Sequence, residues 1–419
     1  MVEITSVELG LRLKTAREAS GRTQEAVAQH LGIPRSGVAQ IEAGKRKVAA
    51  HELIMLADLY GRNPQDFHAE TFDEHPFAAL FRAQPHVEMA PETMNVINKS
   101  LEMGRQMTEL EQMLGLNRSS AASVCYLVPI PNTRFEAIQQ GETLAQEERR
   151  RLALGLTPLG DMSEFLESQD VRTAVVPMDD SISGITLRTA KNGVLVVINK
   201  GHSRKRRRFS HAHEYAHVLF DIARERGGML SQEDNRSSLV EVRANAFAAA
   251  FLMPAEGVRQ FMAGLGKGRG SRVQVDLFDE EIHTPVEVRS DPGSQEVQLY
   301  EVALLAHHFG VSLLSAAYRL KSLKLISESD VVRLKAENVR HGIVVEQMLG
   351  IYEDPRTQEE ERNRFGKKLF VLALEAYRRG LLSHDKLLSL STLFDVKGSD
   401  KLDFILGSDQ STKVVPLNA

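Results

Sequence analysis

The sequence predicts a multidomain, mainly α-helical protein with a small α+β domain in the middle and a helical C-terminal region. Its 419 residues are enough for about two to four domains. Hydrophobic residues make up 42% and charged residues 26%, which is the composition of a globular protein. Runs with the pattern of β-strands occur only in the middle third, whereas helical periodicity occupies both ends.

The N-terminal segment, residues 7 to 67, has the pattern of short helices joined by tight turns. Thr23 is placed to cap the helix "QEAVAQHLG", and Gly32 ends it. Pro34 suits the first turn of the next helix, "RSGVAQIEAG", which Gly44 closes. An amphipathic helix, "AAHELIMLADLYG", follows, so this segment is expected to form a small helical domain.

The middle of the chain mixes strands and helices. Strands are expected at "CYLVPIP" (125–131) and "VRTAVVPM" (171–178), a hairpin with a Lys-Asn-Gly turn at 184–200, and helices at 141–156, 161–170, 209–220 and 239–252. Further on, residues 265–298 are expected to be mostly loop, 300–326 to be helix-turn-helix-like, and 358–408 to be mostly helical. A methionine-rich helix is expected inside a linker that precedes the α+β domain.

The helix "FSHAHEYAHVLF", residues 209 to 220, contains the pattern H-E-x-x-H. His213 and His217 are four residues apart, so a helix places both imidazoles on one face, where they can bind one zinc ion. Glu214 lies beside them and can accept a proton from a zinc-bound water. The alternative is an ordinary helix with two histidines that bind no metal.

A third zinc ligand should be an acid or histidine that follows this helix. The candidates are Asp221, Glu225, Glu233, Asp234, Glu241 and Glu256. Glu241 is preferred, because it opens an alanine-rich helix that can pack closely against the first, with Asn245 one turn further on. The alternative for Glu241 is a solvated acid that the helix dipole favours in a first turn.

These two helices resemble the ImmA/IrrE metallopeptidases. "RRRFSHAHEYAHVLF" followed by "EVRANAFAAAFLMP" is similar to the family pattern, and the resemblance covers roughly residues 125 to 330. It implies a zincin-like domain with His213, His217 and Glu241 as zinc ligands and Glu214 as general base. Tyr215 departs from the family, which more commonly has Leu or Ile at this position.

The N-terminal stretch "RTQEAVAQHLGIPRSGVAQIEAGKRK" resembles XRE/Cro-like helix-turn-helix domains. The second helix of that motif enters the major groove and reads base edges. The resemblance implies base contacts from Arg35, Ser36 and Gln40, and phosphate contacts from Gln24, Lys45 and Arg46. The alternative is a helical module used only for protein contacts.

Composition limits the remaining possibilities. The net charge of −4 gives no overall positive field, so DNA contact must come from a local patch. The single cysteine, Cys125, excludes an internal disulfide; it is either a buried apolar residue or a thiolate that caps the zinc and inhibits the enzyme. The basic run Arg204 to Arg208 is either a solvated loop or a lip that binds an activating single-stranded DNA. With neither a signal peptide nor a long apolar run, we expect a cytoplasmic protein with no membrane contact.

Five domains or segments are expected. They are a helix-turn-helix domain at 1–70, a helical linker at 71–124, a metallopeptidase domain at 125–262, a loop-rich and helical region at 263–345, and a C-terminal helical domain at 346–419. The predicted function is a transcriptional regulator that binds a double-stranded operator as a homodimer. Its zinc endopeptidase would cleave a repressor, or the chain itself, in response to stress or phage-related signals. The alternative is a non-catalytic regulator whose peptidase-like domain senses a ligand or nucleic acid.

Overall fold

The structure, a computed structural model, describes the following parts of the chain. These are residues 4–20, 22–60, 62, 64–68, 90–116, 125–189, 193–222, 228–232, 238–268, 273–279, 282–288, 294–352, 364–391 and 393. Predictions that fall elsewhere, such as the Lys-Asn of the expected hairpin turn or the linker residues 69–89, lie outside the described residues.

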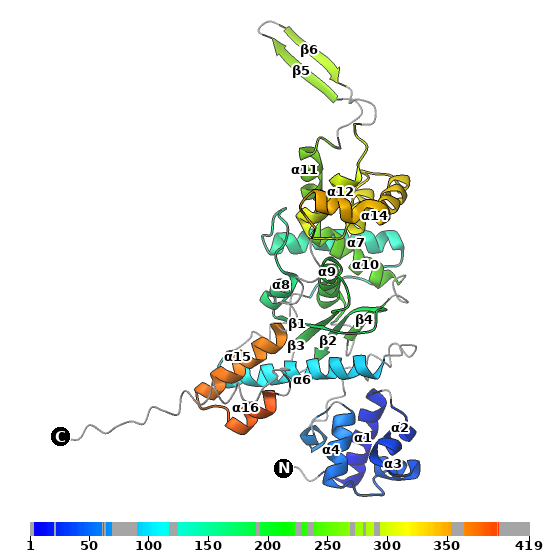
Figure 1. Cartoon of the computed structure of the whole chain (residues 1–419), viewed down its shortest axis with the longest axis vertical. Helices are drawn as coiled ribbons and strands as arrows, with labels where there is room; N and C mark the ends of the chain where they lie inside the picture. Colours follow the sequence, from blue (N-terminus) through cyan, green and yellow to red (C-terminus); the bar gives the residue numbers. More distant parts are fainter. Residues whose placement is uncertain are drawn as a thin grey trace, which may run out of the picture.

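The N-terminal domain is a bundle of short helices around a core of its own (Figure 1). Its elements are α1 (Ser6–Ala19), α2 (Gln24–Leu31), α3 (Arg35–Glu42), α4 (Ala50–Leu59) and the 3-10 helix η1 (Pro64–His68). Thr23 caps α2 by accepting a hydrogen bond from the Ala26 N–H, and Gly32 ends that helix in the left-handed conformation. Both capping predictions are confirmed. Buried Val27, Ile41 and other apolar side chains hold α2 and α3 together.

A four-stranded mixed sheet lies at the centre of the middle domain. Its strands are β1 (Val171–Val176), β2 (Ile182–Thr189), β3 (Gly193–Asn199) and β4 (Gly228–Gln232), in the order β1-β3-β2-β4. Strands β2 and β3 form the expected antiparallel hairpin, while β1 pairs with β3 in parallel. Strand β4, which the sequence pattern did not indicate, pairs antiparallel with β2.

Helices α7 to α10 cover one face of this sheet (Figure 1). They are α7 (Arg134–Arg151), α8 (Met162–Ser168), α9 (Arg204–Phe220) and α10 (Leu239–Leu252). Gly141 lets α7 approach α10 closely, because a Cβ atom there would lie 2.5 Å from the Arg243 carbonyl oxygen. The packing of α7, α9 and α10 around one apolar core therefore fixes the position of α9 over the sheet.

The opposite face of the sheet is covered by helices from two distant parts of the chain (Figure 1). They are α6 (Pro91–Met113), α15 (Arg364–Arg378) and α16 (His384–Ser391). Helix α6 is the helix expected within the linker, yet it packs on the sheet. Buried Arg172 of β1 ties it there, donating to Glu111 at 2.7 Å and to Thr108 at 2.7 Å. One apolar core joins these helices to the sheet.

The remaining elements follow α10. They are α11 (Ala255–Gly264), β5 (Val273–Asp279), β6 (Ile282–Val288), α12 (Leu299–Phe309), α13 (Leu313–Ser322) and α14 (Glu328–Met348). Strands β5 and β6 form an antiparallel hairpin that extends away from the helices in Figure 1. No single helix in the described segments is long and apolar enough to span a membrane; only the pair α12 and α13, bent by 100°, passes that test together.

Three expectations from the sequence are wrong. Residues 125–131 are not a strand: Pro129 and Pro131 have no N–H for a β-ladder. Residues 265–298 contain the β5–β6 hairpin rather than only loop. The basic run from Arg204 to Arg208 is not a loop but the beginning of α9, which Ser203 caps through the Arg206 N–H.

Candidate metal centre and nucleic-acid face

Helix α9 places His213 and His217 on one buried face. Their spacing of four residues brings the two Nε2 atoms to 3.1 Å from each other. His217 is fully buried and His213 is 6% exposed. Two imidazole nitrogens that face each other at this distance repel unless a proton or a metal ion lies between them, so the arrangement favours a bound cation.

Glu241 completes the group from the first turn of α10. Ser238 caps that helix by accepting from the Glu241 N–H, which fixes the direction of the turn. The Glu241 carboxylate lies 3.0 Å from the His213 Nε2 and 3.3 Å from the His217 Nε2. The three ligand atoms lie within 4.8 Å of one another. Two imidazoles and one carboxylate form the donor set that zinc uses in catalytic sites, so the residues fit the metal.

The outer nitrogens of both histidines have partners that orient the rings. His213 Nδ1 lies 3.0 Å from the Asn245 Oδ1, and His217 Nδ1 lies 2.9 Å from the Asp221 carboxylate. A carboxylate only accepts, so His217 carries its proton on Nδ1, and the same holds for His213 if the Asn245 oxygen is the facing atom. Both Nε2 lone pairs then point at the metal position, as is typical of histidine ligands.

Asp221 is itself held by a buried cation. Its other carboxylate oxygen accepts a hydrogen bond from Arg243, which is fully buried beneath the Phe220 ring. The sequence suggested Asp221 as a candidate third ligand, whereas the structure gives it the orienting position behind His217. Its place four residues after His217, at the C-cap of α9, was the signal for that role.

Glu214 points toward the sheet, beside the histidines. One carboxylate oxygen accepts a hydrogen bond from the Thr186 hydroxyl at 2.7 Å, and the other, Oε1, is buried without a hydrogen-bond partner. Gly184 of β2 makes room for this carboxylate, because a Cβ atom there would lie 2.6 Å from Oε1. The sequence did not indicate either strand residue. An unbonded buried carboxylate oxygen on the residue that follows His213 suits a proton acceptor.

In the absence of a metal ion, the pKa values of His217 and Glu241 show that this group favours a bound positive charge. Burial alone would lower the pKa of His217, but the carboxylates of Glu241 and Asp221 outweigh it and hold that pKa well above 6.5. Burial would raise the pKa of Glu241, but the two imidazoles outweigh it and hold that pKa below 4.5. The carboxylate is therefore ionised and needs a cation, whether protons or a metal ion.

Comparison with known families agrees with this geometry. Residues 168–273 match the family model of the IrrE N-terminal-like domain. The middle domain is thus an ImmA/IrrE-like peptidase domain, and the matched segment contains both histidine ligand candidates, Glu214 and Glu241. Residues 8–69 match the model of a helix-turn-helix domain. No curated protein matches the chain.

The expected base-reading residues lie on the outside of the helix-turn-helix domain. Arg35, Ser36 and Gln40 are exposed in the first turns of α3, and Lys45 is exposed just after it. Among the described residues these four side chains have no hydrogen bond or ion pair. This open helical face is the position from which α3 could enter a major groove.

Two of the expected phosphate contacts have partners inside the domain. The Gln24 amide donates to Glu42 at 2.9 Å, and the same Glu42 accepts from buried Arg17 at 2.6 Å. Arg46 donates to Glu52 at 2.7 Å. In this structure both side chains stabilise the domain, and their expected phosphate contacts stay predictions.

Cys125 does not join the metal centre. Its thiol is exposed and is not part of the His213, His217 and Glu241 group. The next residue donates its N–H to the Leu219 carbonyl at 2.8 Å, so this segment runs past the C-terminal end of α9. The expectation of a buried apolar cysteine is wrong, and among the described residues no contact supports an inhibitory thiolate.

The basic run at the start of α9 is largely occupied by internal contacts. Arg208 donates to the carbonyls of Gly160 and Leu159, each at 2.6 Å, and Lys205 pairs with Glu346 at 2.9 Å. Buried Arg207 donates to the His202 carbonyl at 2.8 Å. These bonds fasten α9 to its neighbours, and single-stranded DNA binding by this run stays a prediction.

The structure also explains the unusual Tyr215. Its hydroxyl donates to the Glu148 carboxylate at 2.5 Å, and Tyr126 donates to the same group at 2.8 Å. Glu148 is fully buried on α7 and also pairs with Arg151. Tyr215 therefore stabilises a buried carboxylate in the core that supports α9, a role an aliphatic side chain could not take.

Proposed function

We propose that this protein is a transcriptional regulator whose helix-turn-helix domain binds an operator and whose middle domain is a zinc-dependent endopeptidase. The observation that carries the peptidase proposal is the convergence of His213, His217 and Glu241, together with the unbonded buried oxygen of Glu214, the residue that follows His213 on α9. The family matches support a regulator with a peptidase-like domain. The exposed α3 face supports the DNA-binding part.

Each residue of the centre has a definable task. The two histidines and Glu241 would hold a zinc ion, which when bound would supply Lewis acidity toward a peptide carbonyl and lower the pKa of a water molecule. Glu214 accepts the proton of the attacking water through Oε1 and passes it to the leaving amine. Thr186 holds the other oxygen of Glu214, so the carboxylate keeps one orientation during the transfer.

The substrate is proposed to be a repressor protein or this chain itself, cut in response to stress or phage-related signals in the cytoplasm. The occurrence of a DNA-binding domain and a peptidase-like domain in one chain supports a target that is bound at DNA. The four central side chains are at most 6% exposed. The centre therefore lies largely inside the domain, which supports the proposal that activity is low until a signal exposes it.

The test combines metal analysis with cleavage. The purified chain should contain about one zinc ion, and Glu214→Gln should keep the zinc and lose cleavage of partner repressors or of the chain. Because glutamine still accepts from Thr186 but cannot take a proton, loss of cleavage with retained zinc isolates the general base. A chain that takes up no zinc after zinc is resupplied would refute the assignment.

One observation favours the alternative, a non-catalytic regulator. His213, His217, Glu214 and Glu241 are almost completely buried, which is compatible with a metal-stabilised sensor domain that performs no cleavage. In that case Glu214→Gln would leave the regulatory response unchanged in cells. The same variant therefore separates the two functions, since a peptidase-dependent response must disappear with it.

A further inference from the structure

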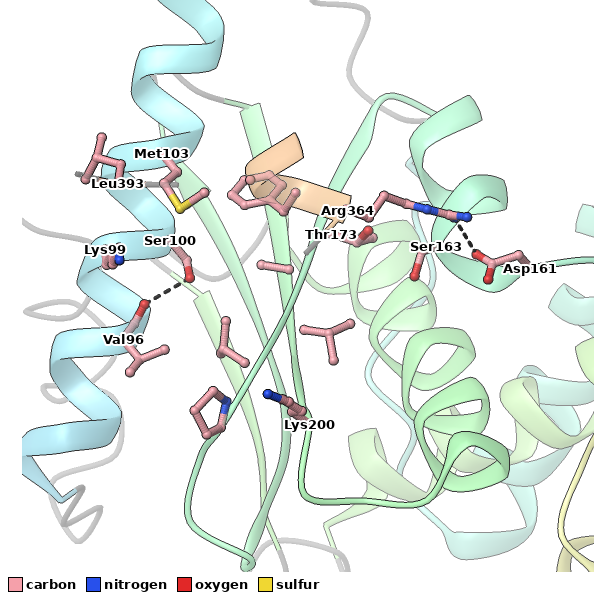
Figure 2. A pocket seen from close by; sticks show the side chains of 16 residues that line it. Val96, Lys99, Ser100, Met103, Asp161, Ser163, Thr173, Lys200, Arg364 and Leu393 are labelled. Carbon is pink, nitrogen blue, oxygen red and sulfur yellow. Dashed lines mark hydrogen bonds and ion pairs between the residues drawn. The ribbon is translucent and has the colours of Figure 1, made fainter. Parts of the chain in front are cut away.

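A cavity lies beside β1, between helices α6 and α15. It has a volume of about 330 Å³, a size suited to a small molecule. Figure 2 shows its lining, with Lys99 and Ser100 on α6, Thr173 on β1, and Lys200 just after β3. None of the metal-centre residues lines it, so it is a separate site.

One wall of this cavity is the open edge of β1, which pairs only with β3 in the described sheet. The Lys200 N–H donates to the Val176 carbonyl at 2.8 Å, so the backbone of Val176 faces β3. Backbone direction alternates along a strand, so Ala174 also faces β3, whereas Thr173 and Val175 face away from it. Their N–H and carbonyl groups are thus directed toward the cavity side, as on any edge strand.

The polar side chains of the cavity are mainly donors. Lys99 and Lys200 have no carboxylate or other side-chain partner in the described chain. Thr173 is only 5% exposed, and its hydroxyl has no hydrogen-bond partner within the same described parts. The Thr173 hydroxyl is therefore available to donate a hydrogen bond to a molecule in the cavity.

The single acid of the lining does not neutralise these lysines. Asp161 caps α8 through the Glu164 N–H at 2.9 Å and pairs with Arg364 at 3.1 Å (Figure 2). The charge of Asp161 is therefore already balanced by Arg364, and the ammonium groups of Lys99 and Lys200 remain without a counter-charge among the described residues. Most of the rest of the lining is apolar, including Val96, Met103 and Phe365.

We propose that this cavity binds a small organic anion, with a carboxylate or phosphate group against Lys99, Lys200 and the β1 edge, and an apolar body against α6 and α15. Two unpaired cations and free donors select negative charge, because charge-assisted hydrogen bonds are the stronger ones. The apolar wall gives the remaining contact area. The site is independent of the proposed peptidase chemistry and would detect a metabolite rather than a peptide.

The experiment uses three ligands with the same aromatic body and different head groups. Benzoate, phenyl phosphate and neutral benzamide are titrated into the full-length protein, and binding is measured by calorimetry. We expect one or both anions to bind and benzamide to bind at least about tenfold more weakly. The stronger of the two anions identifies the head group as carboxylate or phosphate.

The variants locate the binding. Lys99→Ala combined with Lys200→Ala should weaken anion binding at least about tenfold, whereas Lys367→Ala, an exposed lysine on α15 that does not line the cavity, should leave it unchanged. Thermal unfolding confirms that each variant is folded. The proposal is overturned if neither anion binds, if benzamide binds as tightly as the anions, or if the double variant retains wild-type affinity.

Discussion

The recognition helix α3 and the metal centre differ in how their polar side chains are satisfied. Arg35 and Gln40 extend from α3 without a partner in the described chain. At the metal centre each histidine has an inner face toward Glu241 and an outer partner, Asn245 or Asp221. The ligand chemistry of a buried site can be inferred from the contacts among its own residues. The polar side chains of an exposed site find their partners only in the molecule that binds there.

The strongest test of this contrast removes a ligand from the buried site. His217→Ala should reduce zinc from about one per chain to nearly none and abolish cleavage, because two ligands rarely retain zinc. Elemental analysis of purified protein measures the loss. His211→Ala is the matched control: it removes another buried histidine of α9, bonded to Ser163 rather than to the metal group, and should keep the zinc. Equal loss in both variants would contradict the site.

A smaller effect is expected when the outer partners are changed. Asn245→Ala should weaken zinc binding by about 10- to 100-fold, because His213 loses the acceptor that orients its ring. Competition with a chelator of known affinity measures this change. Asn245→Asp keeps an acceptor and should retain most of the affinity. If alanine and aspartate behave alike, ring orientation does not depend on this contact.

The exposed helix should respond differently to substitution. Arg35→Ala should cost about 1–3 kcal/mol on the preferred operator and reduce sequence discrimination, since an arginine at this place reads a base edge. Lys45→Ala should weaken all sequences alike and reduce the salt dependence of binding. Binding titrations on specific and random duplexes at several salt concentrations compare the two. Uniform loss for Arg35→Ala would rule out the proposed groove contact.

The smallest expected effect is on the pH dependence of stability without metal. The raised pKa of His217 means that its stabilising charge is fully present below about pH 6.5 and is lost as pH rises through the folded-state value. The chelated protein should therefore melt at a lower temperature near pH 9 than near pH 7. The zinc-bound protein should show the opposite trend toward acid, where protons displace the metal. The same dependence of melting temperature on pH with and without chelator would contradict this prediction.

The sequence predicted those parts of the fold whose determinants are local. Thr23 and Gly32 specify the ends of α2 by capping chemistry, and the spacing of His213 and His217 specifies a shared helical face. The family patterns supplied Glu241, which spacing alone left open against other acids. The position of Asp221 behind His217 could have been recognised from the spacing of four residues between them.

The parts that the sequence did not predict depend on distant contacts. Gly184 and Thr186 meet Glu214 only because β2 passes beneath α9. The hydrogen bond from Gln24 to Glu42 joins two different helices of the N-terminal domain. The prediction of a strand at 125–131 was wrong because it relied on the apolar residues and neglected the two prolines. Packing across the sheet and pairing between helices leave no short-range pattern in the chain.

The layer formed by α6 and α15 has a consequence for synthesis on the ribosome. Helix α6 ends at Met113, but its partner α15 begins only at Arg364, after the whole sheet and the metal centre have been made. At ordinary rates of translation, the apolar face of the sheet waits tens of seconds for its cover. During that interval the nascent chain carries an incomplete three-layer core, which makes it a natural client for chaperones and leaves truncated products prone to aggregation.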